Sequence, residues 1–230
     1  MKHQPLKTNI AIKAIIFDRY GTLVDFSDMF LCFIHDIYSQ QNILPDTDAV
    51  ILSYEFWHQI ISEDLHIGEI RVCDHLNEIP LKYIPEHGKF YQGIEQTIHN
   101  FHNKGLKMTI VSGRVGTEAT EILLKRLGVF ECFECVLTQD DLEESHFAHQ
   151  KPGSATIKTQ LQKQAINHLN LPLESILVVG DAPDDIESGQ ALKLKTIAVM
   201  TGNGQKLHKK IRALNPNWIV DSVAELKNRL

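Results

Sequence analysis

The sequence lacks the features that mark secreted, membrane and nucleic-acid-binding proteins. It has no apolar stretch near its amino terminus of the roughly 7 to 15 residues that a secretory signal needs. Its apolar runs are far shorter than the roughly 20 residues required to span a bilayer. A net charge of −6 over 230 residues provides no basic field for nucleic acid. These absences predict a cytoplasmic protein with neither a membrane nor a nucleic-acid partner.

Cysteine is also scarce, and the four cysteines favour reduced thiols over a disulfide framework. Cys132 and Cys135 have the spacing of half a zinc site or of a redox pair. No second pair or histidine partner stands at ligand spacing, so we predict two small residues entering a strand. His146 and His149 are also three apart, but the sequence specifies no third ligand for them.

The bulk composition is that of an ordinary folded protein, with 43% hydrophobic and 23% charged residues. The charges are unevenly distributed. Residues 26–88 carry a net charge of −9, whereas the rest of the chain carries +3. Such a step in charge indicates that residues 26–88 form a unit of their own.

Short apolar runs that end at Asp, Ser, Thr or Gly recur along the chain, and each is typical of a parallel strand buried on both faces. They are Ala14 to Phe17, Met108 to Val111, Val136 to Leu137, Ile176 to Val179 and Thr196 to Val199. Apolar residues at helical spacing fill the gaps between them, at Ile94, Ile98 and Phe101, at Leu123, Leu124 and Leu127, and at Ile157, Leu161 and Ala165. Strands that alternate with helices predict an α/β fold with a doubly wound, mostly parallel sheet.

Residues 26–88 interrupt this alternation with helical stripes. One stripe joins Phe26, Phe30, Phe33, Ile34 and Ile37, and a second joins Val50, Tyr54, Trp57 and Ile61. We therefore predict an α-helical insert after the first strand. The expected domains are 1–25 with 89–230 as the α/β core, and 26–88 as the insert.

Polar residues follow the predicted strands in a consistent pattern. Asp18 follows the first strand, Ser112 the second, and Asp181 the strand that ends at Gly180. Ligands in doubly wound sheets bind beyond the carboxyl ends of the strands, so these groups should meet at one site. A carboxylate nucleophile, a hydroxyl, a cation and further carboxylates for a divalent metal are what displacement at a phosphorus or carbon centre needs.

Four segments carry a family resemblance: Asp18 to Asp25, Ser112 to Arg114, Lys151-Pro152, and Gly180 to Asp185. In this order they resemble the four motifs of the haloacid dehalogenase superfamily. The resemblance implies a Rossmann-like core, and it implies that the helical insert is a cap domain that selects the substrate.

The resemblance also implies roles for individual residues. The catalytic residues would be Asp18 as the nucleophile, Tyr20, Ser112 and Lys151. Phosphate would bind at Gly21, Thr22, Ser112, Gly113, Arg114 and Lys151. Mg²⁺ would bind at Asp18, at the backbone carbonyl of Tyr20, at Asp181 and, directly or through water, at Asp185. The implied activity is a magnesium-dependent phosphatase that acts on a small phosphorylated molecule.

Tyr20 departs from the phosphatase pattern, which usually has an aspartate two residues after the nucleophile as general acid and base. A phenol is a poor base near neutral pH. Tyrosine at this position also resembles the 2-haloacid dehalogenases, which leaves that reaction open as the alternative. Two features argue against dehalogenation. The fourth motif is acidic, as in a magnesium site. Those dehalogenases also use an arginine soon after the first motif to hold the substrate carboxylate, whereas the first arginine after Arg19 is Arg71. A third alternative is a protein that binds a phosphate compound without turnover.

Other side chains could still contribute to the site. A histidine of the insert, His35, His58 or His66, could replace the missing aspartate, and Asp25 is a weaker candidate. Gly202 to Gly204 could contact phosphate, although a plain turn is the simpler interpretation. The negative charge of 26–88 predicts poor binding of polyanions.

Overall fold

The computed structural model describes residues 10–62, 64–142 and 153–230. Its main sheet has six strands, all parallel, in the order β10-β9-β8-β1-β6-β7. Their bounds are β1 Ala14–Asp18, β6 Lys107–Val111, β7 Cys135–Leu137, β8 Ile176–Gly180, β9 Lys195–Val199 and β10 Trp218–Val220. The chain starts at the central strand and builds outwards in both directions, so the predicted doubly wound α/β fold is confirmed.

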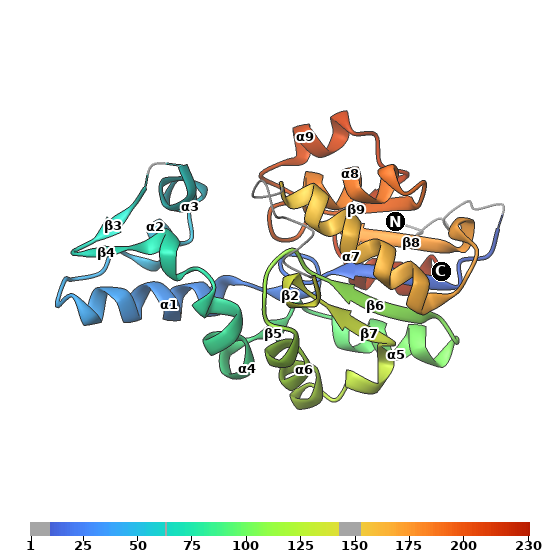
Figure 1. The fold of residues 1–230 in the computed structure, drawn as a ribbon, viewed down its shortest axis with the longest axis horizontal. Coiled ribbons are helices and arrows are strands. Elements are labelled where there is room, and N and C mark those ends of the chain that lie inside the picture. The colour runs from blue at the N-terminus through green and yellow to red at the C-terminus, as the bar shows by residue number, and fades with distance from the viewer. Residues whose placement is uncertain (1–9, 63, 143–152) are drawn as a thin grey trace.

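Helices cover both faces of this sheet (Figure 1). The helices of the α/β part are α5 Ile94–Asn103, α6 Thr117–Arg126, α7 Ser154–Leu169, α8 Pro183–Ala191 and α9 His208–Ala213. Alternate residues of β1 face opposite sides, as strand geometry requires. Ile15 and Phe17 pack in the core with α5 and α6, whereas Ala14 and Ile16 pack with α7. All five predicted strands are confirmed, while β10 was not predicted.

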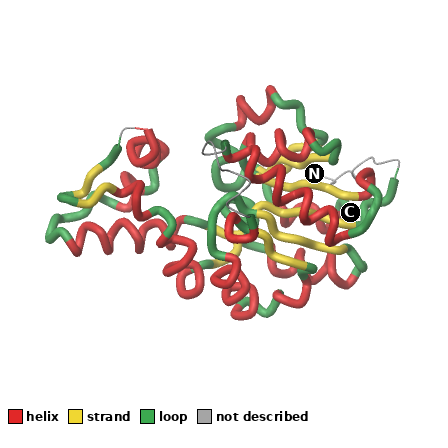
Figure 2. The backbone as a smooth tube through the Cα atoms, in the orientation of Figure 1, coloured by secondary structure: helices red, strands yellow, loops and turns green. Residues whose placement is uncertain are grey.

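The insert follows β1 and is mostly helical. It comprises α1 Ser27–Gln40, α2 Asp48–Ile51, α3 Tyr54–Ser62, a hairpin of β3 His66–Ile67 and β4 Ile70–Arg71, the π-helical segment Ile79–Tyr83, and α4 Ile84–His87. Figures 1 and 2 show α1, α2, α3 and the hairpin projecting to one side of the sheet. At its base, β2 Val24–Asp25 pairs antiparallel with β5 Lys89–Phe90, so the chain enters and leaves the insert side by side.

The second predicted stripe of the insert is wrong in phase. The helix over this region breaks at Leu52 and Ser53, where the Ser53 hydroxyl accepts a hydrogen bond from the Phe56 backbone N–H at 3.1 Å. Val50 and Ile61 are consequently 47% and 52% exposed. The buried residues of these two helices include Ile51, Phe56 and Ile60 instead.

Candidate active site

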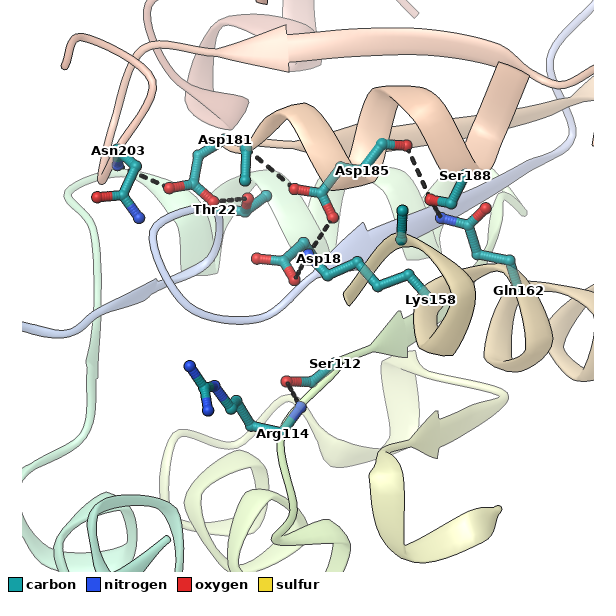
Figure 3. A network of polar contacts seen from close by, with 12 residues as sticks. Asp18, Thr22, Ser112, Arg114, Lys158, Gln162, Asp181, Asp185, Ser188 and Asn203 are labelled. Carbon is teal, nitrogen blue, oxygen red and sulfur yellow. Dashed lines mark hydrogen bonds and ion pairs between the residues drawn. The ribbon is translucent and has the colours of Figure 1, made fainter. Parts of the chain in front are cut away.

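Strand register brings three distant polar residues to one edge of the sheet. Asp18 stands opposite Val111, the residue before Ser112, and Phe17 stands opposite Val179, two residues before Asp181. Because neighbouring parallel strands end together, Asp18, Ser112 and Asp181 gather at the carboxyl edge (Figure 3). The predicted convergence is confirmed.

Three buried carboxylates form the centre of the site. An oxygen from each of Asp18, Asp181 and Asp185 lies within 4.8 Å of an oxygen from the others, and their exposed fractions are 7%, 2% and 1%. Burial, reinforced by the charge of Asp18, raises the pKa of both Asp181 and Asp185. Holding three such groups charged together needs compensating positive charge.

Lys158 supplies part of that charge from α7. Its Nζ donates to Asp18 Oδ1 at 2.8 Å and also contacts Asp185 Oδ1 (Figure 3). Burial lowers the pKa of Lys158, but Asp18 and Asp185 raise it by more, so the net shift is upward and the ammonium stays charged. Lys151, the lysine expected from the sequence, lies outside the described residues.

A signal for Lys158 was present in the sequence. Lys158 and Gln162 are one helical turn apart and adjoin the predicted core positions Ile157 and Leu161. Both polar side chains are buried, and Gln162 Nε2 donates to Ser188 Oγ at 2.8 Å. A lysine beside the apolar face of a helix calls for a buried acidic partner.

Asp181 is held from two sides. Thr22 Oγ1 donates to its Oδ1 at 3.3 Å, and the backbone N–H of Asn203 donates to its Oδ2 at 2.7 Å. Gly21 and Gly202 approach so closely that a Cβ on either would collide with the Asp181 carboxylate. Both have positive φ, at +77° and +53°, which glycine adopts without strain. The turn at Gly202 thus packs against Asp181, and a contact of Gly202 to Gly204 with phosphate stays a prediction.

Ser112, Gly113 and Arg114 line the same cavity as Asp18. Ser112 is 2% exposed, and its hydroxyl accepts a hydrogen bond from the Arg114 backbone N–H at 3.3 Å. The Arg114 side chain is exposed and forms no ion pair with any residue that the structure describes. It is thus available to an anionic ligand.

Arg19 turns away from the site and is fully buried. Its guanidinium donates to the Val115 carbonyl at 3.0 Å and to Thr120 Oγ1 at 2.6 Å. Its Cζ lies 4.1 Å from the centre of the Tyr20 ring. The Tyr20 hydroxyl is buried without a hydrogen-bond partner among the described residues, and burial raises its pKa. Tyr20 therefore contributes an apolar ring to the site rather than a proton donor.

A cavity of about 700 Å³ opens above these groups, between the sheet edge and the insert. Asp18, Asp25, Ser112, Lys158 and Asp181 are among the residues on its α/β side. No histidine of the described residues lines it. His35 instead pairs with Asp48 at 2.9 Å, so the proposed histidine replacement for the missing aspartate is not supported.

The cysteine pair lies apart from this cavity. Cys132 and Cys135 are free thiols, Cys135 opens β7, and burial raises its pKa to about 11. The prediction of two residues entering a strand therefore holds for Cys135, whereas Cys132 ends the 3-10 helix Phe130–Cys132. His146 and His149 lie outside the described residues.

The model of one protein family, described as haloacid dehalogenase-like hydrolase, matches residues 15–199. The chain belongs to this family of hydrolases. The match includes Asp18, Ser112, Lys158, Asp181 and Asp185, so all the groups around the acidic centre lie within the family region.

Individual relatives within the haloacid dehalogenase-like hydrolases are distant. A protein named pyrophosphatase PpaX from Anoxybacillus flavithermus is 27% identical, over 94% of this chain and 95% of the relative. One named phosphoglycolate phosphatase from Nitrosococcus oceani is 26% identical over 61% of this chain and 56% of its own length. The crystal structure of a predicted phosphoglycolate phosphatase from Haemophilus somnus superposes with a TM-score of 0.68 at 20% identity, covering 95% and 97% of the two chains.

The described part of this hydrolase contains no helix that is both long and apolar enough to cross a membrane.

Proposed function

We propose that this chain is a magnesium-dependent phosphatase that hydrolyses a small phosphomonoester through an aspartyl-phosphate on Asp18. The proposal rests on three buried carboxylates, those of Asp18, Asp181 and Asp185. Among the described residues, one ammonium, that of Lys158, contacts this set. The names of the relatives, pyrophosphatase and phosphoglycolate phosphatase, support a small phosphorylated substrate.

The donor set fits Mg²⁺, since hard cations of this kind prefer carboxylate and carbonyl oxygen ligands. Asp18, Asp181, the Tyr20 carbonyl and, directly or through water, Asp185 would hold the ion. The clustered oxygens and the excess of negative charge both favour it. When bound, Mg²⁺ would supply positive charge that lets a phosphate dianion approach Asp18.

The proposed reaction has two displacements at phosphorus. An Asp18 oxygen attacks phosphorus, and the bond from phosphorus to the leaving oxygen breaks. Water then attacks the same phosphorus and breaks its bond to Asp18, which restores the carboxylate and releases phosphate. The Ser112 hydroxyl and the backbone amide of Gly113, on two residues that line the cavity, would hold the phosphoryl oxygens.

We assign the role of the positioning lysine to Lys158 rather than to Lys151. Its contact with Asp18 Oδ1 holds one carboxylate oxygen and leaves the other to act as the nucleophile. We also propose that 26–88 forms the cap domain and that 1–25 with 89–230 forms the core, since the chain crosses between them at the β2–β5 pair.

Dehalogenation fits the cavity less well. That reaction would use an arginine of the insert to hold the substrate carboxylate. Arg71 instead pairs with Asp74 at 2.9 Å and does not line the cavity, while Arg19 faces Val115 and Thr120.

Phosphate release from p-nitrophenyl phosphate, measured with and without Mg²⁺, tests the proposal. We expect release that requires Mg²⁺ and falls by at least about 10³-fold in Asp18→Asn, because the amide is not a nucleophile. Halide release from 2-haloacids without metal would contradict the proposal. So would phosphate release that Asp18→Asn leaves intact.

A further inference from the structure

The insert covers the cavity with uncharged side chains. Nine residues of this segment line it, and they are Phe26, Ser27, Phe30, Leu52, Ser53, Trp57, Leu76, Ile79 and Pro80. We call these nine residues the roof. Seven of them are apolar and two are serines, so whatever is attached to the phosphate meets hydrocarbon and ring faces.

Three aromatic rings of the roof form one packed group. The rings of Phe26 and Phe30 stack with centroids 5.3 Å apart and an interplanar angle of 24°. Trp57 meets them edge-on, at 5.9 Å from Phe26 and 5.5 Å from Phe30. All three line the cavity, and Phe30 is buried whereas Phe26 and Trp57 are half-buried. Their mutual packing fixes an aromatic surface, which favours a flat aromatic ligand.

The negative charge of the insert is directed elsewhere. Asp36, Asp48 and Asp74 are engaged by Lys82, His35 and Arg71 respectively. No described acidic residue of 26–88 lines the cavity. The sequence-based expectation that this charge repels polyanions therefore has no direct counterpart in the roof. Its apolar character instead disfavours small, highly hydrated leaving groups, because they would lose water without gaining a hydrogen-bond partner.

Tyr20, two residues after Asp18, bears on how far the leaving oxygen depends on a proton donor. Tyr20 has no carboxyl group, and its hydroxyl is buried without a partner among the described residues. Its ring packs edge-on against Phe26 at 5.4 Å, as an extension of the aromatic group. A leaving group that departs as a stabilised anion depends least on proton donation. Aryl oxides meet this condition better than alkoxides.

We propose that the preferred substrates are aryl phosphomonoesters, in which phosphate is joined through a phenolic oxygen to a flat apolar ring that packs against Phe26 and Trp57. This inference rests on the proposed phosphatase activity and names its substrate class. The cavity of about 700 Å³ lies within the usual range for sites that bind small organic ligands.

The test compares kcat/KM for naphthyl phosphate, phenyl phosphate, phosphoglycolate and pyrophosphate, all with Mg²⁺. Naphthyl and phenyl phosphate share a phenolic leaving oxygen of similar acidity, so their ratio reports ring packing alone. We expect naphthyl phosphate to exceed phenyl phosphate by about 5- to 10-fold. Both should exceed the two polar substrates.

Variants on α3 locate the effect. Trp57→Ala should lower the ratio of naphthyl to phosphoglycolate hydrolysis by about 10-fold, and Trp57→Phe should restore most of it. Ile61→Ala is the matched control, because Ile61 lies on the same helix, is 52% exposed and does not line the cavity. Its ratio should equal that of the wild type.

The experiment can contradict the aryl proposal without contradicting the phosphatase proposal. Phosphoglycolate or pyrophosphate hydrolysed faster than the aryl phosphates, or a ratio that Trp57→Ala leaves unchanged in a protein with a native circular dichroism spectrum, would overturn the aryl proposal alone. No Asp18-dependent phosphate release from any of the four substrates would overturn the phosphatase proposal and the aryl proposal with it.

Discussion

Lys158 neutralises part of a buried cluster of negative charge. Two matched variants, one at each lysine, distinguish its role from that of Lys151. Lys158→Met removes the ammonium that contacts Asp18 and Asp185. We expect kcat/KM for p-nitrophenyl phosphate to fall by about 10²- to 10³-fold, since preorganised charge at a reacting group contributes on this scale. Lys151→Met should stay within about 3-fold of the wild type.

The stability of Lys158→Met tests the buried ion pair independently of catalytic activity. Removing one partner of a buried ion pair costs about 3 to 5 kcal/mol, because the remaining charge stays buried without compensation. Lys158→Met should therefore lower the urea midpoint in the absence of metal. The assignment would be wrong if Lys151→Met lost activity while Lys158→Met retained it.

Arg19 anchors the loop after β1 to the start of α6. Arg19 donates to the carbonyls of Val115 and Gly116 and to the hydroxyl of Thr120. It is fully buried and lies next to Asp18, the proposed nucleophile, in sequence. The bonds tie the segment that carries Asp18 to the segment that follows Ser112, so two parts of the site move together.

Arg19→Met should lower the free energy of unfolding by about 3 kcal/mol, because it leaves buried acceptors without their charged donor. Arg19→Lys should fall between the two proteins, since an ammonium cannot reproduce the planar fork. Urea denaturation measures both. A loss below about 0.5 kcal/mol in Arg19→Met would show that the anchor is unimportant for stability.

Three buried carboxylates and one lysine leave an excess of negative charge at the sheet edge, so metal binding there should stabilise the whole folded molecule. Mg²⁺ at 100 times its dissociation constant would add about 2.7 kcal/mol to the free energy of unfolding. For a chain of this length we expect the Tm to rise by about 5 to 10 °C. Sodium chloride at equal ionic strength should not reproduce this rise.

Asp181→Asn provides the matched control for the metal effect. The variant removes one of three buried carboxylates, so its metal-free form should be at least as stable as the wild type. It should also lose most of the Tm rise with Mg²⁺. A wild-type Tm that does not respond to Mg²⁺ would contradict the assignment of the acidic cluster as a metal site.

Local sequence determined five of the six strands and most of the helices of the α/β part, because apolar runs ending in polar residues and helical spacing report burial directly. It also determined the gathering of Asp18, Ser112 and Asp181, since parallel strands end at a common edge. These inferences needed only the order of residues and the geometry of a sheet.

Tertiary structure decided what depends on contacts between distant segments. Lys158 is placed beside Asp18 by the packing of α7 on the sheet, and residue spacing cannot show this. The approach of Gly202 to Gly21 and the turn of Arg19 toward α6 are likewise long-range contacts. The aromatic group of the roof forms where α1 and α3 pack together. A helix stripe specifies which residues are apolar but not which of them border a cavity.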